Sequence, residues 1–179
     1  MRATFSFLGR NFALSFISRR EYKNKTIGYT NATKDGMFIP VLDYDHKNHE
    51  RIRAEIERLQ RQYCLGDFHI FETIKGYHAV CFDKVTLDHF IKLIKQTTVD
   101  PKYIQIPLEY GARQWTLRFS HKNKHKPRYC GTLNADNTRR TKSTPHINLL
   151  NKLYPTLLFG YKMEQMDNHD EMMISTYNV

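Results

Sequence analysis

The sequence predicts an α+β fold of the split βαβ type, an antiparallel sheet that carries both of its helices on one face. The first observation is the order of the expected elements, which between residues 37 and 120 runs strand, helix, strand, strand, helix, strand. The second is a length of 179 residues with 40% hydrophobic residues, enough for one domain with a real core. With both helices on one face, the other face of the sheet is expected to be free for a ligand.

The first 36 residues are expected to form small strands that pack on this core. Phe5, Phe7, Leu14 and Phe16 alternate with polar or small residues, as in strands. Residues 1–20 are also rich in Arg and free of acids, which faintly resembles a transit peptide. The alternation favours two short strands.

The core begins with an apolar strand over 38–42 and a helix over 46–65. Isoleucine and leucine recur at helical spacing in the second segment, and Arg and Glu occupy the opposite face. Gly66 is the expected end of this helix.

The remaining core elements follow the same rules. Strands are predicted over 68–73 and 77–82, joined by a tight turn. Thr86 is placed to cap the second helix. Two further strands are predicted over 103–106 and 115–120, and they complete the sheet.

The chain then changes character. Residues 121–146 are read as a mobile basic loop without periodicity, and 147–179 as a short helix followed by a weakly ordered acidic tail. Between His121 and Lys142 a single acid, Asp136, faces the following basic residues: Lys122, Lys124, Lys126, Arg128, Arg139, Arg140 and Lys142. The predicted division is therefore 1–36, 37–120, 121–146 and 147–179.

Charge and cysteine content narrow the class of partner. The formal net charge of +10 favours a polyanion, with nucleic acid first. Cys64, Cys81 and Cys130 are far apart and form no CxxC pair, which argues against a zinc knuckle and a disulfide framework. No apolar run approaches the roughly 20 residues of a membrane span. An intracellular protein without a membrane partner is expected.

Two acids stand at the end of the first core strand. Asp43 and Asp45 are two residues apart, so in a strand they point the same way, on one face with Ile39 and Val41. Neighbouring carboxylates repel each other, and a chain that places them side by side usually binds a cation there. The sequence therefore predicts a divalent metal site at this strand end.

A second cluster lies in the expected hairpin. Lys75 and His78 can both donate to a phosphate, and Gly76 allows close approach of the backbone. A histidine in a strand is, by itself, more often structural than a ligand. The cluster gains significance from the acid pair predicted in the neighbouring strand.

These segments resemble the motifs of the archaeo-eukaryotic primase superfamily, which includes primase-polymerases and the polymerase domains of bacterial end-joining ligases. The resemblance spans about residues 37 to 120 and implies an RRM-like catalytic core. The matching segments are Val41-Leu42-Asp43-Tyr44-Asp45, Thr73-Ile74-Lys75-Gly76-Tyr77-His78, Val99-Asp100 and Arg113-Gln114-Trp115-Thr116-Leu117-Arg118-Phe119. Where the family usually has Ser or another small residue two before the histidine, this chain has Gly76, with Thr73 further upstream.

The resemblance implies a role for each residue. Asp43, Asp45 and Asp100 would hold two Mg²⁺ or Mn²⁺ ions, with Glu109 as the substitute for Asp100. The triphosphate of the incoming nucleotide would be bound by Lys75, His78 and Arg118. The single-stranded DNA or RNA template would follow the basic loop through Lys122, Lys124, Lys126, Arg128, Arg139 and Arg140. The implied activity is that of a template-dependent nucleotidyltransferase, a small primase or polymerase.

Three other functions remain open at this point. A non-catalytic single-strand-binding module would explain the basic loop, although the acid pair would repel phosphate. A sugar-nucleotide glycosyltransferase shares the Asp-x-Asp pattern, but the positive charge and short length speak against it. A metal-dependent nuclease would use the acids and would not need the Lys75–His78 cluster.

Overall fold

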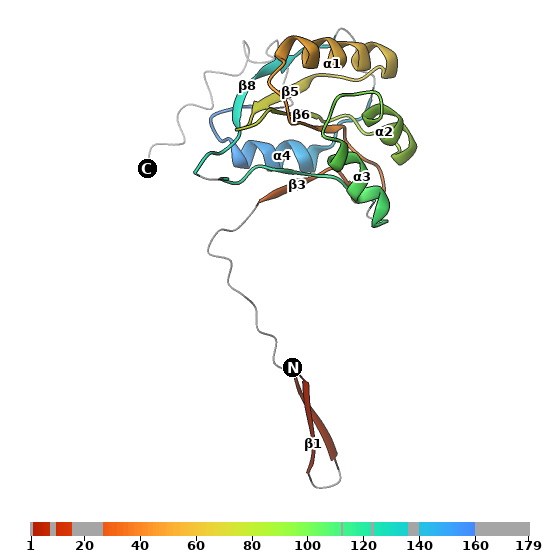
Figure 1. The fold of residues 1–179 in the computed structure, drawn as a ribbon, viewed down its shortest axis with the longest axis vertical. Coiled ribbons are helices and arrows are strands. Elements are labelled where there is room, and N and C mark those ends of the chain that lie inside the picture. Colours follow the sequence, from red (N-terminus) through yellow and green to blue (C-terminus); the bar gives the residue numbers. More distant parts are fainter. Residues whose placement is uncertain are drawn as a thin grey trace, which may run out of the picture.

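The computed structural model describes the backbone of residues 2–7 and 10–15, and residues 27–159 apart from 112, 123 and 136–139. Over these residues the fold is mixed α+β, which confirms the predicted class (Figure 1). The elements are β1 (Arg2–Phe7), β2 (Arg10–Ser15), β3 (Gly28–Thr30), β4 (Val41–Tyr44), α1 (His49–Tyr63), β5 (Phe68–Glu72), β6 (Tyr77–Cys81), α2 (Leu87–Ile94), α3 (Pro101–Glu109), β7 (Thr116–Arg118), β8 (Arg128–Leu133) and α4 (Thr144–Leu153).

The main sheet has four antiparallel strands in the order β4-β6-β5-β8. A second, two-stranded pair joins β3 to β7, and β7 lies against β4. The N-terminal strands β1 and β2 pair with each other, as the alternation predicted. Their predicted packing on the core depends on side chains that lie outside the described residues.

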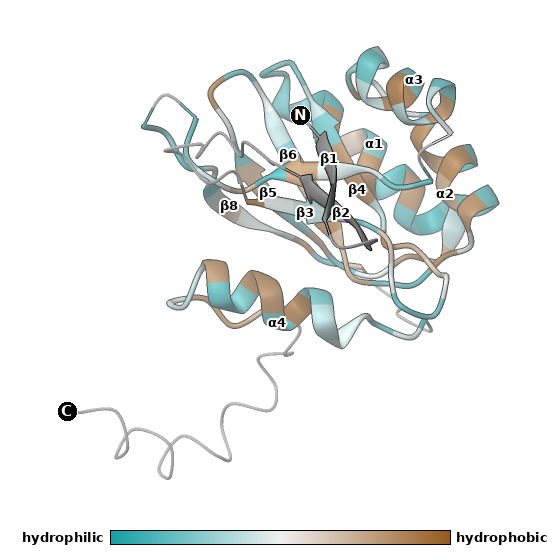
Figure 2. Ribbon diagram, turned by 90° about the horizontal axis from the view of Figure 1, so that it is seen from below, coloured by the Kyte–Doolittle hydropathy of each residue, from teal (hydrophilic) through white to brown (hydrophobic). Residues whose placement is uncertain are grey.

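Helices cover both faces of the sheet. The α1 and α2 helices lie on one face and α4 lies on the other (Figures 1 and 2). After α4, the Tyr154 ring lies 5.1 Å from the ring of Phe71 on β5 at a tilt of 43°, and the Phe159 ring lies 5.0 Å from that of His69. The expectation of a free sheet face is therefore wrong, because α4 and the residues after it cover most of the face opposite α1. The end of the sheet near Asp43 opens into a cavity.

The segment predicted as a strand over 103–106 is instead the helix α3. The Asp100 carboxylate accepts a hydrogen bond from the backbone N–H of Lys102 at 3.0 Å, and Pro101 occupies the first helical position. A capping acid followed by proline is a strong helix start, and it outweighs the strand preference of Tyr103, Ile104 and Ile106.

The region read as a basic loop contains a strand of the main sheet. β8 pairs with β5 along its length, with an irregularity between Ile70 and Phe71. The sequence concealed this strand because Gly131, at φ +144°, and Arg128 interrupt its apolar pattern. The helix expected after the loop is confirmed as α4, and the predicted acidic tail lies outside the described residues.

The strand expected over 115–120 is shorter than predicted and belongs to the β3–β7 pair. Trp115, just before β7, is 1% exposed and packs edge-on against Phe90 at 4.9 Å. Its indole is part of the core rather than a surface for stacking a base. Among the described residues, no helix has the length and apolarity needed to cross a membrane.

The ends of α1 differ from the prediction by a few residues. Asn48 caps its first turn by accepting a hydrogen bond from the Arg51 N–H at 3.1 Å. Cys64, in the left-handed conformation with φ 50°, ends it before Gly66. The predicted cap of α2 is confirmed, since the Thr86 hydroxyl accepts from the His89 N–H.

Candidate functional site

A cavity of about 670 Å³ lies at the open end of the sheet. Its walls come from the end of β4, the β5–β6 turn, β7 and the segment that leads into β8. A volume of this size is typical of small-molecule sites. Eight of the residues predicted from sequence line it, namely Asp43, Asp45, Lys75, His78, Arg118, Lys122, Lys126 and Arg128.

The Asp43 and His78 side chains meet across the β4–β6 pair. The two residues are direct partners in the antiparallel register, so both side chains leave the same face of the sheet. His78 Nε2 lies 3.3 Å from Asp43 Oδ1. The His78 side chain is 8% exposed and its ring lies 5.6 Å from the ring of Phe119, whereas the Asp43 side chain is 32% exposed. His78 thus forms part of the cavity floor, with its Nε2 edge toward the acid.

The β5–β6 turn is held tightly against the end of β4. A Cβ atom on Gly76 would lie 1.8 Å from the carbonyl oxygen of Tyr44, so only glycine fits. The turn is closed by Thr73, whose N–H donates to the Gly76 carbonyl at 2.9 Å and whose hydroxyl accepts from the Gly76 N–H at 3.0 Å. This contact brings Lys75 Nζ to 3.9 Å from Asp45 Oδ2.

One face of β7 contributes to the opposite wall. Thr116, Arg118 and Ser120 alternate along the chain, and all three line the cavity. Leu117 and Phe119 point the other way and are fully buried. The strand period therefore presents the Arg118 guanidinium to the same cavity as the acid pair.

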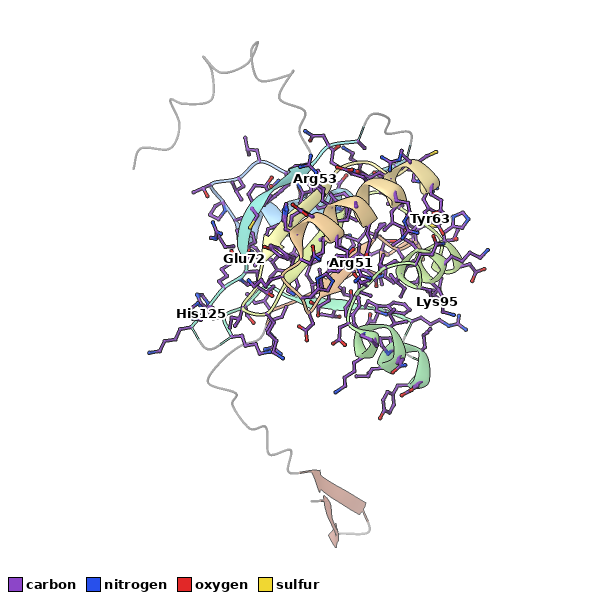
Figure 3. The ribbon with its side chains drawn as sticks, turned by 45° about the horizontal axis from the view of Figure 1, so that its top comes forward. Arg51, Arg53, Tyr63, Glu72, Lys95 and His125 are labelled. Atoms are coloured by element: carbon purple, nitrogen blue, oxygen red, sulfur yellow. The ribbon has the colours of Figure 1, made fainter. Side chains whose placement is uncertain are left out.

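Glu72 links two cations at the edge of the cavity. Its carboxylate lies 2.8 Å from Lys47 Nζ and 2.6 Å from Arg128 Nη2. Hydrogen bonds from these two cations lower the pKa of the Glu72 carboxyl, and the bond from Lys47 has the larger effect. Figure 3 shows Glu72 and His125 at the same side of the molecule. The lining comprises six Lys or Arg residues and three acids, so its local charge favours an anion.

The predicted template contacts are only partly gathered there. Lys126 Nζ donates to the Leu153 carbonyl at 2.5 Å and lies 4.1 Å from the centre of the Tyr154 ring, which anchors the end of α4. Lys122 and Lys124 are exposed on the tight turn before β8. Arg140 donates to the Tyr63 carbonyl at the end of α1, away from the cavity lining. Arg139 lies outside the described residues.

The predicted third carboxylate does not line the cavity. The Asp100 N–H donates to the Asp43 carbonyl at 2.9 Å, which places the two backbones side by side, and the Asp100 carboxylate caps α3. Glu109 stands at the exposed last turn of α3 and is also absent from the lining. Within the described part of the chain, no group of three His, Cys, Asp or Glu side chains is close enough to hold a metal.

Sequence reasoning missed several lining residues: Lys47, Glu72, Thr116, Ser120 and His125. Lys47 stands only two residues after Asp45, and Glu72 precedes the predicted turn, so proximity to the motifs was the available signal. His125 lies in the predicted basic loop, where it was expected to add to phosphate affinity at most. No family model, curated protein or solved structure matches this chain. A function must therefore be argued from the cavity itself.

Proposed function

We propose that the chain is a template-dependent nucleotidyltransferase, a small primase or polymerase. The observation that carries the proposal is the joint lining of one cavity by an acid pair and by side chains from three other segments that can donate to a phosphate. Asp43 and Asp45 on their own would suit many metal sites. Lys75, His78 and Arg118 in the same cavity add the donors that a triphosphate requires.

Each residue has a distinct part in this proposal. Lys75 and Arg118 bind the triphosphate from opposite walls and orient its α-phosphorus toward the primer end. His78 Nε2 donates a hydrogen bond at the cavity floor, beside Asp43. The template backbone is bound by the exposed Lys122 and Lys124 turn.

The donor set fits a hard divalent ion that the nucleotide helps to bind. Mg²⁺ is typically held by one or two protein carboxylates together with substrate phosphates, and Asp43 and Asp45 provide that number. When bound, Mg²⁺ or Mn²⁺ would stabilise the charge on the attacking 3′-oxygen and on the leaving pyrophosphate. The backbone of Asp100 supports that of Asp43. Binding of a second ion by the Asp100 carboxylate stays a prediction.

A single-strand-binding module is the second candidate. It is favoured by the basic excess of the lining and by the lack, among the described residues, of three clustered metal-binding side chains. Such a module would bind nucleic acid with Asp43 and Asp45 unused. Its affinity would be unchanged or higher after removal of these acids.

The test supplies single-stranded template and labelled nucleotides with Mg²⁺ or Mn²⁺, with and without a primer. Product without primer identifies a primase, and product only with primer identifies a polymerase. Asp43→Asn is the matched inactive variant. If the wild type and Asp43→Asn bind template equally well and neither forms product, the protein is a binding module rather than an enzyme.

A further inference from the structure

The face of the β4 end turned away from the cavity carries a second set of contacts. Tyr44 alternates with Asp43 in β4 and so points to the opposite side of the strand, and His46, two residues farther on, contacts Tyr44 on that side. Tyr44 is fully buried, and its ring lies 5.7 Å from the His46 ring. His46 Nε2 lies 2.9 Å from the hydroxyl of Thr98, in the connection between α2 and α3. The acid-bearing segment is therefore bound from behind.

The hydrogen-bond directions in this chain of contacts follow from the number of protons. The Thr98 hydroxyl has one proton and donates it to Glu55 Oε1 at 2.8 Å. Thr98 Oγ1 then accepts from His46, which requires a proton on the histidine Nε2. Glu55 also accepts the Thr98 N–H at 2.9 Å and Arg51 Nε at 3.2 Å. The result is a directed chain from His46 through Thr98 to Glu55 on α1, where Figure 3 labels Arg51.

The same connection also covers the outer edge of β4. β4 is an edge strand of the four-stranded sheet, so its outward carbonyls need partners. The Asp43 carbonyl accepts from the Asp100 N–H at 2.9 Å, and the Val41 carbonyl accepts from the Tyr103 hydroxyl at 3.1 Å. Because Thr98 is anchored to Glu55, the segment that binds the Asp43 backbone is itself held on α1.

We infer that the Glu55–Thr98–His46 chain positions the Asp43 and Asp45 carboxylates for a divalent cation, an inference that rests on the proposed function. The two acids repel each other, and a loose strand end would let them turn apart. Asp100 contacts the backbone of Asp43, and Thr98 contacts His46, the residue after Asp45. Together these contacts keep both carboxylates directed into the cavity. Glu55, Thr98 and His46 touch neither nucleotide nor ion, and they are positioning residues.

Replacing Thr98 by valine tests this inference, because valine keeps the shape of threonine and removes the hydroxyl. The measurement is the Mn²⁺ affinity of the full chain, from electron paramagnetic resonance of free Mn²⁺ without nucleotide. Supporting groups around metal ligands are typically worth about 10- to 100-fold in affinity, so Thr98→Val should bind Mn²⁺ at least about tenfold more weakly. Thr98→Ser should retain the wild-type affinity. Thr97→Val is the matched control, since the Thr97 hydroxyl donates only to the local Ile94 carbonyl at 2.7 Å.

Each outcome decides the question. Equal Mn²⁺ affinity in wild type and Thr98→Val would overturn the positioning role, as would an equal weakening in Thr97→Val. If Thr98→Val does not fold, His46→Phe replaces it, because phenylalanine keeps the ring against Tyr44 and removes the donor; wild-type affinity there would also overturn the role. Mn²⁺ binding by the wild type without nucleotide transfer would remove the proposed enzyme and leave the positioning role standing. Failure of the wild type to bind Mn²⁺ without nucleotide would overturn the positioning role, and the incorporation assay would still decide the proposed enzyme.

Discussion

The carboxylates of Asp43 and Asp45 are ordered mainly through their neighbours. At Gly76 the β5–β6 turn lies directly against the Tyr44 carbonyl. The Asp100 N–H donates to the Asp43 carbonyl, and His46 is hydrogen-bonded to Thr98. The acids themselves have few strong partners, since the nearest basic side chains lie at 3.3 Å and 3.9 Å. Side chains held in this way are available to a ligand while their backbone stays fixed.

Asp43→Asn should abolish nucleotide incorporation and leave the fold intact. The substitution removes one of the two carboxylates proposed to bind the ion and keeps the size of the side chain, so transition-state charge stabilisation should disappear without a packing defect. Incorporation rate and melting temperature are measured together. Asp88→Asn, at an exposed position of α2, is the control and should behave as the wild type. Normal turnover in the Asp43 variant would end the enzyme proposal.

His78→Phe should raise the KM for nucleotide while template affinity stays near normal. Phenylalanine keeps an aromatic ring in this buried position but has no donor, so the charge-assisted hydrogen bond to the phosphate is lost. A bond of that kind is worth about 1.5–3 kcal/mol, or very roughly 10- to 100-fold in kcat/KM. Stability, single-strand affinity and incorporation against nucleotide concentration are needed on the same variant. A lower melting temperature with unchanged KM would show that His78 only fills the core.

At the scale of elements, the β5–β6 turn determines the shape of the cavity floor. Gly76→Ala should destabilise the fold by about 1–3 kcal/mol, because its Cβ would collide with the backbone of Tyr44 rather than with a side chain that can move. It should also weaken nucleotide binding, since Lys75 moves with the turn. Urea unfolding and nucleotide titration measure the two effects. Gly36→Ala is the control: its φ of +76° makes alanine strained there, but the space around it is open and it does not line the cavity. Equal nucleotide binding in both variants would contradict this account.

The joint between β5 and β8 makes stability depend on pH. Burial of His69 lowers the pKa of its imidazole from 6.5 to about 4. The unfolded chain therefore takes up a proton at a higher pH than the folded chain. The contribution of neutral His69 is complete above pH 6.5 and is lost as the pH falls toward 4, an effect of up to about 3 kcal/mol.

The urea concentration at the unfolding midpoint of the wild type should therefore decrease when the pH is lowered from 7 to 4.5. In His69→Phe, which retains the contacts with Phe82 and Phe159, it should fall less. His89→Gln, at an exposed position of α2, should follow the wild type. Parallel pH profiles in the wild type and His69→Phe would show that another group is responsible.

The elements that could be predicted from sequence are those whose pattern is local. The stripe of α1, the Thr86 cap and the strands β5 and β6 were readable because periodicity or a capping residue marks each one. α3 was misread because its strand-forming residues hid the Asp100-Pro101 start. β8 was missed because its pairing with β5 is long-range and leaves little trace in its own composition.

The candidate site was predictable to a similar extent. The motif spacing brought Asp43, Asp45, Lys75, His78 and Arg118 together correctly. It said nothing of Glu72, whose role depends on Lys47 and Arg128 arriving from other segments. It also could not show that the Asp100 carboxylate is directed to α3 rather than to the cavity.

For the whole molecule, charge is distributed unequally over the surface. Lys122 and Lys124 are exposed beside the cavity, while Lys126 and Arg128 already bind Leu153 and Glu72. Lys122→Gln/Lys124→Gln should weaken single-strand binding for every sequence alike. The log–log salt slope should flatten by about 0.7 for each phosphate that the variant no longer neutralises. Binding is measured against salt concentration.

The matched control is Lys92→Gln/Lys95→Gln, in the last turn and at the C-cap of α2 and outside the cavity lining, which has the same change of net charge. A slope unchanged in the Lys122/Lys124 variant would show that this turn faces another partner. A slope flattened equally in both variants would show that total charge, rather than this turn, attracts the nucleic acid.

The position of Phe159 has a consequence for how the chain acquires its structure. This ring packs against His69, Phe71, Tyr129 and Tyr154, so the β5–β8 side of the core closes only when residues some ninety positions apart have met. Contacts this distant in sequence form late, because a long loop must first lose its freedom. During synthesis the strands β4, β5 and β6 emerge well before their cover. Until Phe159 arrives, an apolar sheet face is open to other chains, which makes the nascent protein a candidate for chaperone binding.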